Sequence, residues 1–403
     1  MLSTRLVKIC NGKIITPHKI ILNGSILISG NKIINVKEGN IEAPGALQID
    51  AGEKYIAPGF IDIHVHGGGG YDFMDATETA FLKAAELHVQ YGTTSMTPTT
   101  LSSSKEELLQ VLALYESANS KNTKGAQFLG LHLEGPYISM NQRGAQDARF
   151  IRAPEPEEYK DILSRTSSVK RWSAAPELKG AIELGNYLQS KGILPAIAHT
   201  DAIYEEVLPA VDAGYKHVTH LYSAMSGVTR RNAMRHAGVI ESAFLLDELT
   251  VEIIADGVHL PPALLKLIYK IKGADKIALI TDAMRGAGMP EGESILGSKQ
   301  NGLKVIIEDN VAKLPDRSSF AGSVATADRL VRNMITLAEV PLHDAVKMMT
   351  LTPATIMAIQ DKKGSLVPDK DADLVIFDDN ITIYGTMVMG KWLYKKEGFD
   401  GNL

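Results

Sequence analysis

The chain contains a single cysteine and no long apolar run. Cys10 stands alone among 403 residues, which excludes an intrachain disulfide and a cysteine-based zinc site. A lone thiol is also typical of a reducing compartment. No segment approaches the roughly 18 to 20 apolar residues that a membrane span requires, and the first residues, MLSTRLVKICNGKIITPHKI, lack the apolar core of a secretory signal. We therefore expect a cytoplasmic protein with no membrane partner.

The charge balance gives no sign of a polyanionic partner. The chain has 42 basic and 47 acidic residues, a formal net charge of -5, so we expect no binding to nucleic acid. Its apolar content of 45% and charged content of 22% are ordinary for a soluble globular protein. The length is sufficient for one large domain and a small one.

Both ends of the chain are typical of short β-strands. Residues 1–55 contain β-like pieces separated by turns such as Asn23-Gly24, and residues 359–403 have the same pattern. We predict that these two segments together build one small β-sandwich domain.

Residues 56–358 alternate between short apolar runs and helix-like stretches. Leu108, Val111, Leu112 and Tyr115, for example, fall near helical spacing. Eight of the runs have β character, and eight strands alternating with helices indicate an α/β fold of the (β/α)₈ TIM-barrel type. The predicted strands lie in FIDIHVH, TTSMTPTT, FLGLHLEG, VKRWSAAP, ILPAIAHT, HVTHLY, LTVEIIAD and KIALITDA.

One segment, residues 284–319, interrupts this alternation. Its composition predicts a glycine-rich loop and a hairpin after the eighth strand. In a barrel that position lies over the mouth, so the segment is either an inserted lid or a surface excursion.

Candidate metal ligands recur where the predicted strands end. In barrels of this type the active site lies at the carboxyl ends of the strands. Because side chains alternate along a strand, the two histidines of the first strand point the same way. The residues at the strand ends are His64, His66, Glu134, His199, His220 and Asp282.

Four imidazoles and two carboxylates suit a divalent ion, Zn²⁺ first and Fe²⁺ as the alternative. Burying these groups together without a metal would leave several polar atoms unpaired, at a cost in free energy. We interpret His132 as a buried, hydrogen-bonded neighbour of Glu134. The remaining histidines outside the site are interpreted as ordinary polar residues: His18, His88, His217, His236 and His343.

Several longer segments resemble those of the N-acetylglucosamine-6-phosphate deacetylases, a family of the amidohydrolase superfamily. They are PGFIDIHVHG, LHLEGPYIS, IAHTDA, VTHLYSAM, IIADGVHLPP, LITDAMRGAGMPEG and FAGSVATADRLVRNM, with GSLVPDKDADLVIFD near the end. The resemblance implies a barrel with a β-sandwich and a homodimer. It also implies hydrolysis of the N-acetyl group of N-acetylglucosamine 6-phosphate, giving glucosamine 6-phosphate and acetate.

The resemblance also assigns metal ligands. Glu134, His199 and His220 would hold the main ion, while His64, His66 and Asp282 would complete a second site that shares Glu134. Because the chain keeps both histidines of the first strand, one or two ions per subunit are expected.

Other roles follow from the same resemblance. Asp282 would take a proton from water and deliver it to the departing amine, and His259 would stabilise the oxyanion. The substrate would contact Ser223, Ala224 and His259, and its phosphate would contact Arg231, with Arg230 as an adjacent rival. Gln146 would reach the phosphate bound by the neighbouring subunit.

Two departures from the family pattern leave the identity of the sugar undecided. The family usually has Asn where Ser223 stands and often an acid where Asn232 stands. The same chemistry on N-acetylgalactosamine 6-phosphate is therefore an alternative.

Other amidohydrolases are further alternatives. Cyclic amidases commonly place a modified lysine at the end of the fourth strand, whereas Lys170 lies at its start, and the H-x-x-E motif typical of the deaminases does not occur. A non-catalytic scaffold is the remote alternative, but such relatives usually lose metal ligands, and all six are present here.

Overall fold

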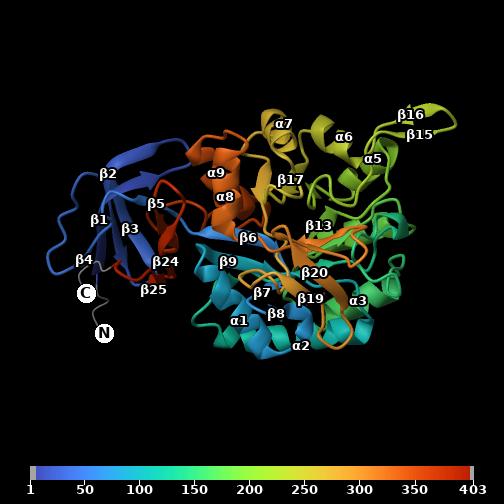
Figure 1. Cartoon of the computed structure of the whole chain (residues 1–403), viewed down its shortest axis with the longest axis horizontal. Helices are drawn as coiled ribbons and strands as arrows, with labels where there is room; N and C mark the ends of the chain where they lie inside the picture. Colours follow the sequence, from blue (N-terminus) through green and yellow to red (C-terminus); the bar gives the residue numbers. More distant parts are fainter. Residues whose placement is uncertain (1–5, 400–403) are drawn as a thin grey trace.

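The computed structural model of the chain describes residues 6–399 (Figure 1). All eight predicted barrel strands are present, although the third is split into two short pieces. The strands are β6 (Phe60–Val65), β9 (Thr93–Pro98), β10 (Gln127–Phe128), β11 (Leu131–Glu134), β12 (Val169–Ala174), β13 (Leu194–Ile197), β14 (His217–Val218), β17 (Thr250–Ile253) and β18 (Ile277–Leu279).

These strands form two parallel arcs. One arc has the order β10-β9-β6 and the other the order β11-β12-β13-β14-β17-β18. A parallel bridge between Thr99 and His132 links β9 to β11. At the other edge, the backbone amide of Asp282 donates to the carbonyl oxygen of His64 at 2.9 Å. The arcs thus meet at both edges, as in a TIM-barrel-type fold.

Helices cover the outside of the arcs (Figure 1). The first two helices begin after Thr77 and Ser104, whose hydroxyls accept hydrogen bonds from backbone N–H groups at 3.1 and 3.2 Å. The predicted helical periodicity is confirmed, since Leu108, Val111 and Tyr115 are buried. The helices are α1 (Glu78–Val89), α2 (Lys105–Lys121), α3 (Pro156–Ser164), α4 (Ala181–Ser190), α5 (Tyr204–Asp212), α6 (Val239–Leu245), α7 (Pro262–Lys272), α8 (Ala327–Thr336), α9 (Leu342–Met348) and α10 (Leu351–Ile356).

The two ends of the chain build one eight-stranded sheet beside the barrel (Figure 1). Its order is β25-β24-β23-β5-β1-β2-β3, with β4 paired to β1, and β23 runs antiparallel to β5. Residues 1–5 and 400–403 of the predicted small domain lie outside the described residues. The strands are β1 (Leu6–Ile15), β2 (Ile20–Ser29), β3 (Lys32–Glu38), β4 (Leu47–Asp50), β5 (Tyr55–Pro58), β23 (Leu374–Phe377), β24 (Ile383–Val388) and β25 (Lys391–Lys395).

The segment after β18 contains more than the hairpin that the sequence predicts. It forms a four-stranded antiparallel sheet: β19 (Gly292–Leu296), β20 (Leu303–Glu308), β21 (Val311–Lys313) and β22 (Phe320–Ser323). The two additional strands complete a small apolar cluster with Val305, Ile307 and Met284, which a lone hairpin would leave exposed. Arg285 anchors this sheet through an ion pair with Asp75 at 2.9 Å.

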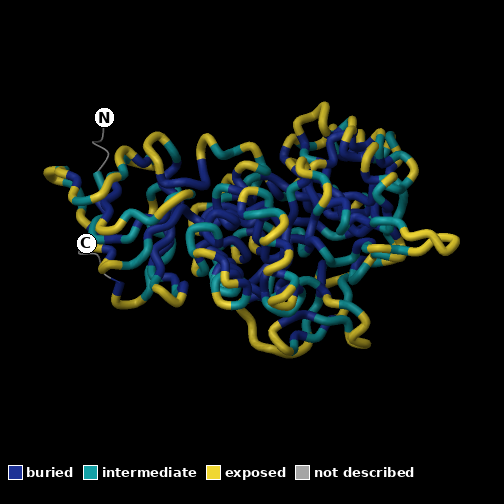
Figure 2. Tube along the Cα trace, turned by 90° about the horizontal axis from the view of Figure 1, so that it is seen from above, coloured by how far each residue is buried: buried dark blue, intermediate teal, exposed yellow. Residues whose placement is uncertain are grey.

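Two short hairpins lie near the strand ends. The glycine-rich stretch after β6 forms β7 (Gly67–Gly68) and β8 (Tyr71–Asp72), and a Cβ on Gly67 would collide with the Tyr71 carbonyl oxygen. The second hairpin, β15 (Thr229–Arg231) and β16 (Met234–His236), projects from the body (Figure 1). It is largely exposed, in contrast to the buried barrel interior (Figure 2).

Across the described residues, no helix combines the length and apolar character needed to cross a membrane.

The barrel and the sheet of the chain ends share an aromatic contact that predicts a stability effect. Phe377 of β23 is fully buried and lies 5.7 Å from the ring of Tyr55 and 6.2 Å from that of Phe60. Phe377→Ala should lower the free energy of unfolding by about 3–5 kcal/mol because it opens a cavity. Leu22→Ala, at a residue 63% exposed, is the control and should change it by about 0.5 kcal/mol or less. Urea unfolding followed by circular dichroism measures both, and equal midpoints would contradict this packing.

Candidate active site

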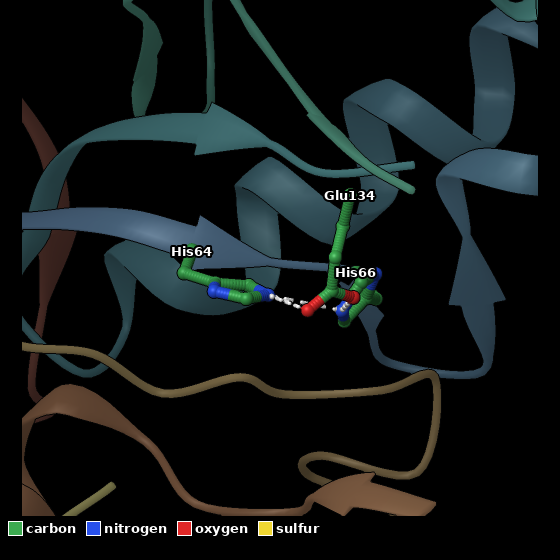
Figure 3. Close-up of side chains that lie close together, drawn as sticks. All are labelled: His64, His66 and Glu134. Carbon is green, nitrogen blue, oxygen red and sulfur yellow. Dashed lines mark hydrogen bonds and ion pairs between the residues drawn. The ribbon is translucent and has the colours of Figure 1, made fainter. Parts of the chain in front are cut away.

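Three side chains from two strands meet at the mouth of the barrel. Figure 3 shows His64 of β6 and His66, which directly follows β6, pointing toward the carboxylate of Glu134 at the end of β11. The Nε2 atom of His64 lies 3.5 Å from Oε1 of Glu134, and that of His66 lies 3.3 Å from Oε2. The two Nε2 atoms are 3.2 Å apart. All three residues are buried.

A second group of ligands shares the same carboxylate. The Nε2 atoms of His199 and His220 lie 3.3 and 3.0 Å from Oε1 of Glu134. These histidines follow β13 and β14, so neighbouring barrel strands deliver them to one place. Nδ1 of His199 lies 2.7 Å from the carbonyl oxygen of Gln142, which holds the ring with Nε2 toward Glu134.

The spacing of the donor atoms fits a metal ion. Four ligands that surround an ion tetrahedrally at about 2.0–2.1 Å lie about 3.3 Å from one another. The distances from the four Nε2 atoms to the carboxylate oxygens of Glu134, 3.0 to 3.5 Å, match this edge length. Nitrogen and carboxylate oxygen are ligands that Zn²⁺ and Fe²⁺ accept. The residues present therefore fit a divalent ion in either group.

Asp282 joins the first group from the end of the eighth strand. Its Oδ1 lies 3.4 Å from Nε2 of His64 and 3.1 Å from Nε2 of His66. Burial by itself raises the pKa of Asp282, but the two imidazoles outweigh it and hold the pKa below its usual range. Asp282 is therefore a carboxylate that can accept a proton.

The site as a whole favours positive charge. Burial by itself raises the pKa of Glu134, yet His64 and the other imidazoles hold it well below its usual range. Conversely, burial lowers the pKa of His64, but Glu134 and Asp282 raise it to about 9. A bound cation would take over the role of these protons.

The backbone is strained at three of the candidate ligands. His199, His220 and Asp282 have φ values of 45°, 29° and 48°, in the left-handed region that favours glycine. Each such residue costs about 1–3 kcal/mol and persists only where its surroundings hold it. This left-handed conformation turns the chain at the end of each strand and places the side chain over the barrel mouth.

A buried charge pair below the ligands was missed by sequence reasoning. Arg171 of β12 and Glu252 of β17 are fully buried and form an ion pair. Burial by itself raises the pKa of Glu252, but Arg171 and then His217 and His64 hold it well below its usual range. The available signal was a charged residue inside the apolar runs VKRWSAAP and LTVEIIAD, where a barrel strand is otherwise apolar.

Two further polar contacts support the strand ends. His132 is buried, as predicted, with Nε2 2.7 Å from the Ser173 hydroxyl. Asp62 of β6 accepts a hydrogen bond from the Thr281 hydroxyl at 2.5 Å and so ties the first strand to the eighth. Burial raises the pKa of Asp62 to about 7.

A cavity of about 250 Å³ opens above the ligands. Ser223, Ala224 and His259, which the sequence predicts as substrate contacts, all line it. Phe320 of the inserted sheet also lines it and packs on His259 with ring centroids 4.7 Å apart. Nδ1 of His259 lies 2.8 Å from Oδ2 of Asp256, which fixes the ring.

Gln146, for which the resemblance implies a contact with the phosphate of a neighbouring subunit, has its side chain buried in the cavity of its own chain. Its amide nitrogen donates to Oε2 of Glu134 at 2.8 Å, and its oxygen accepts from the Ser102 backbone at 2.7 Å. Both contacts hold it beside the shared carboxylate.

Arg231 does not reach the cavity of its own chain. It lies on the projecting β15–β16 hairpin, its side chain is 50% exposed, and its nearest acidic partner is Glu206 at 3.9 Å. Arg230, the adjacent rival, is also exposed on this hairpin.

Comparisons with known proteins show the family of the chain. The model of the amidohydrolase family matches residues 55–393. N-acetylglucosamine-6-phosphate deacetylase from Bacillus subtilis is 34% identical over 382 residues, covering 94% of each chain. N-acetylgalactosamine-6-phosphate deacetylase from Escherichia coli O157:H7 is 30% identical, covering 89% of this chain and 93% of that one.

A solved structure is similar over nearly the whole chain. It is a mutant N-acetyl-D-glucosamine-6-phosphate deacetylase from Mycobacterium smegmatis in complex with N-acetyl-D-glucosamine-6-phosphate. The two share a TM-score of 0.89 and 29% identity, over 97% of this chain and 100% of the other. With two histidine pairs around one carboxylate at the mouth of a TIM-barrel-type fold, the chain belongs to the amidohydrolase family.

Proposed function

We propose that the protein is a metal-dependent deacetylase that hydrolyses N-acetylglucosamine 6-phosphate to glucosamine 6-phosphate and acetate. The observation that carries the proposal is the shared carboxylate of Glu134, which lies within 3.5 Å of Nε2 in His64, His66, His199 and His220. The similarity to deacetylases along almost the full length supports the reaction class.

The candidate ligands define where a metal ion would bind. Glu134, His199 and His220 would hold one divalent ion, and Glu134, His64 and His66, with Asp282 beside them, would hold a second. Zn²⁺ is the first candidate and Fe²⁺ the second. Such an ion would lower the pKa of water and polarise the amide carbonyl.

Asp282 is the proposed proton carrier. Its lowered pKa makes it a carboxylate before the reaction, so it can accept a proton from the attacking water as a new C–O bond forms. The same proton can then pass to the amine nitrogen as the C–N bond breaks. The second proton of the attacking water also ends on the amine, so acetate and the protonated amine are the products and Asp282 returns to its starting state.

His259 is the proposed contact for the carbonyl oxygen. Asp256 holds the ring through Nδ1 and through the backbone amides of Val258 and His259, both at 2.8 Å. When it is protonated on both nitrogens, a ring fixed in this way can donate from Nε2 to the substrate oxygen without reorganising. Leu296 and Ser319 line the cavity, which supports a lid role for residues 284–319, and the adjacent Phe320 packs on the ring of His259.

The phosphate site is proposed to be completed by a second subunit. Ser223 and Ala224 line the cavity, whereas Arg231 is not among the lining residues and lies on an exposed hairpin. In a homodimer this hairpin would deliver Arg231 to the neighbouring cavity, where a planar guanidinium matches phosphate oxygens. Gln146 would then act on its own subunit's site.

We also propose that the sheet built by the two chain ends is a β-sandwich. The sheet of the chain ends has its own apolar cluster, which includes Ile9, Ile26 and Leu374. A sheet that curls around such a cluster would form the predicted β-sandwich.

Deacetylation of N-acetylgalactosamine 6-phosphate is the second candidate function. One similar protein bears that name, and Ser223, a departure from the usual pattern, lines the cavity. The structure gives less support to a cyclic amidase, because Lys170 is exposed and its amine donates to the Ser167 carbonyl oxygen at 3.1 Å.

Acetate release from four sugars tests the function. The 6-phosphates of N-acetylglucosamine and N-acetylgalactosamine are compared with the two unphosphorylated sugars, and kcat/KM should be highest for N-acetylglucosamine 6-phosphate. A preference for the galactosamine compound would select the second candidate. Absence of acetate from all four would reject the deacetylase.

Asp282→Asn tests the proton carrier. An amide keeps the shape but cannot accept a proton, so kcat should fall about 10²- to 10⁴-fold. Metal analysis of the same preparation should still find an ion, since Glu134, His199 and His220 are intact. Full activity in this variant would assign the proton transfer to another residue.

Arg231→Ala and Arg230→Ala form a matched pair on one hairpin. A charge-assisted hydrogen bond contributes about 1.5–3 kcal/mol, so loss of Arg231 should raise KM for the phosphorylated sugar about 10- to 100-fold. Turnover of the unphosphorylated sugar should not change. The Arg230 variant should resemble the wild type. The opposite ranking would move the phosphate contact to Arg230.

A further inference from the structure

His64 differs from the other three imidazoles in what holds its Nδ1 atom. Nδ1 of His64 lies 3.3 Å from Oε2 of Glu252. Nδ1 of His199 contacts a backbone carbonyl oxygen. Within residues 6–399, the Nδ1 atoms of His66 and His220 have no hydrogen-bond partner. Only one of the four rings is therefore held by a charged side chain of the described residues.

Glu252 is itself held by a guanidinium. Arg171 donates to both of its carboxylate oxygens, at 3.0 Å for Oε2, and also donates to the Thr219 hydroxyl at 2.6 Å and the Ile63 carbonyl oxygen at 3.3 Å. His217 contributes Nε2 at 3.1 Å from Oε1. Glu252, Arg171 and His217 are fully buried, so their positions are fixed from several sides.

This arrangement determines how His64 can bind. A carboxylate next to Nδ1 keeps the ring proton on that nitrogen, which leaves the lone pair of Nε2 for a ligand. Nε2 is the atom that faces Glu134, His66 and Asp282. Arg171 balances the added negative charge, because an unpaired buried carboxylate would be costly.

We infer that Arg171 and Glu252 are positioning residues that prepare His64 to ligate a metal ion in the His64–His66–Glu134 group. The inference rests on the proposed metal-dependent function and adds a site-selective element to it. The Glu134–His199–His220 group receives one contact from the pair, a long one of 3.4 Å from the His220 backbone amide to Glu252. Loss of the pair should therefore weaken one group and spare the other.

The test removes both charges together. Removing one partner would leave a buried unpaired charge, whereas replacing both by apolar residues is often neutral for stability. The variant Arg171→Met/Glu252→Leu abolishes the acceptor for Nδ1, and Arg171→Met/Glu252→Gln restores a neutral one. Lys363→Met/Asp373→Leu removes another buried ion pair, in the segment that precedes β23, as the matched control.

Zn²⁺ content and affinity are the measurements. Each stripped protein is titrated with Zn²⁺ against a chromophoric chelator, its ion content is measured after gel filtration, and its fold is checked by circular dichroism. Supporting partners of this kind change metal affinity about 10- to 100-fold. In the Met/Leu variant the affinity for one of the two ions should fall by that factor. The Met/Gln variant should recover part of this affinity, and the control variant should bind both ions as the wild type does.

The outcomes distinguish failure of the inference from failure of the proposed function. His64→Ala shows which ion depends on this ring, because the affinity for that ion should fall in the variant. The inference would be overturned if the Met/Leu variant bound both ions with wild-type affinity. It would also be overturned if the wild type bound a single ion and His64→Ala left the affinity for that ion unchanged. Equal weakening in the Met/Leu and Met/Gln variants would show a merely structural pair. A wild-type protein that binds no ion would instead reject the proposed function.

Discussion

The carboxylate of Glu134 is the point on which the arrangement of the site depends. The two histidines at the end of β6 and just after it approach one side, and the histidines that follow β13 and β14 approach the other. A buried carboxylate surrounded by imidazoles is stable only when positive charge, as protons or a metal ion, is shared among them. The barrel supplies this geometry because parallel strands end at the same rim, even though their residues are distant in sequence.

The support beneath the rim is as specific as the ligands. The ion pair of Arg171 and Glu252 fills the barrel interior where apolar side chains are usual, and Asp62 ties the first strand to the eighth. Such buried polar groups are stable only when each has its partners. Precise placement of the ligands thus depends on residues that never touch the substrate.

Much of this arrangement could be predicted from the sequence. The alternation of strands and helices and the six ligand positions follow from local pattern and strand ends, and the structure brings these six residues together. Long-range geometry could not be predicted in the same way. Glu252 was not singled out, and the contact of Gln146 with Glu134 could not be derived, because both depend on distances between strands rather than on spacing along one. The inserted segment was also underestimated, since pairing of β21 and β22 with the hairpin is a tertiary contact.

The pairing of β5 with β23 has a consequence for biosynthesis. The amino-terminal strands emerge from the ribosome first, but the edge of β5 acquires its partner only when the last part of the chain has been made. Until then an unpaired strand edge and its apolar side chains are open to other chains, which favours aggregation or capture by a chaperone. A nascent chain that stops before residue 374 would retain the whole barrel sequence and still lack the strand that closes this edge.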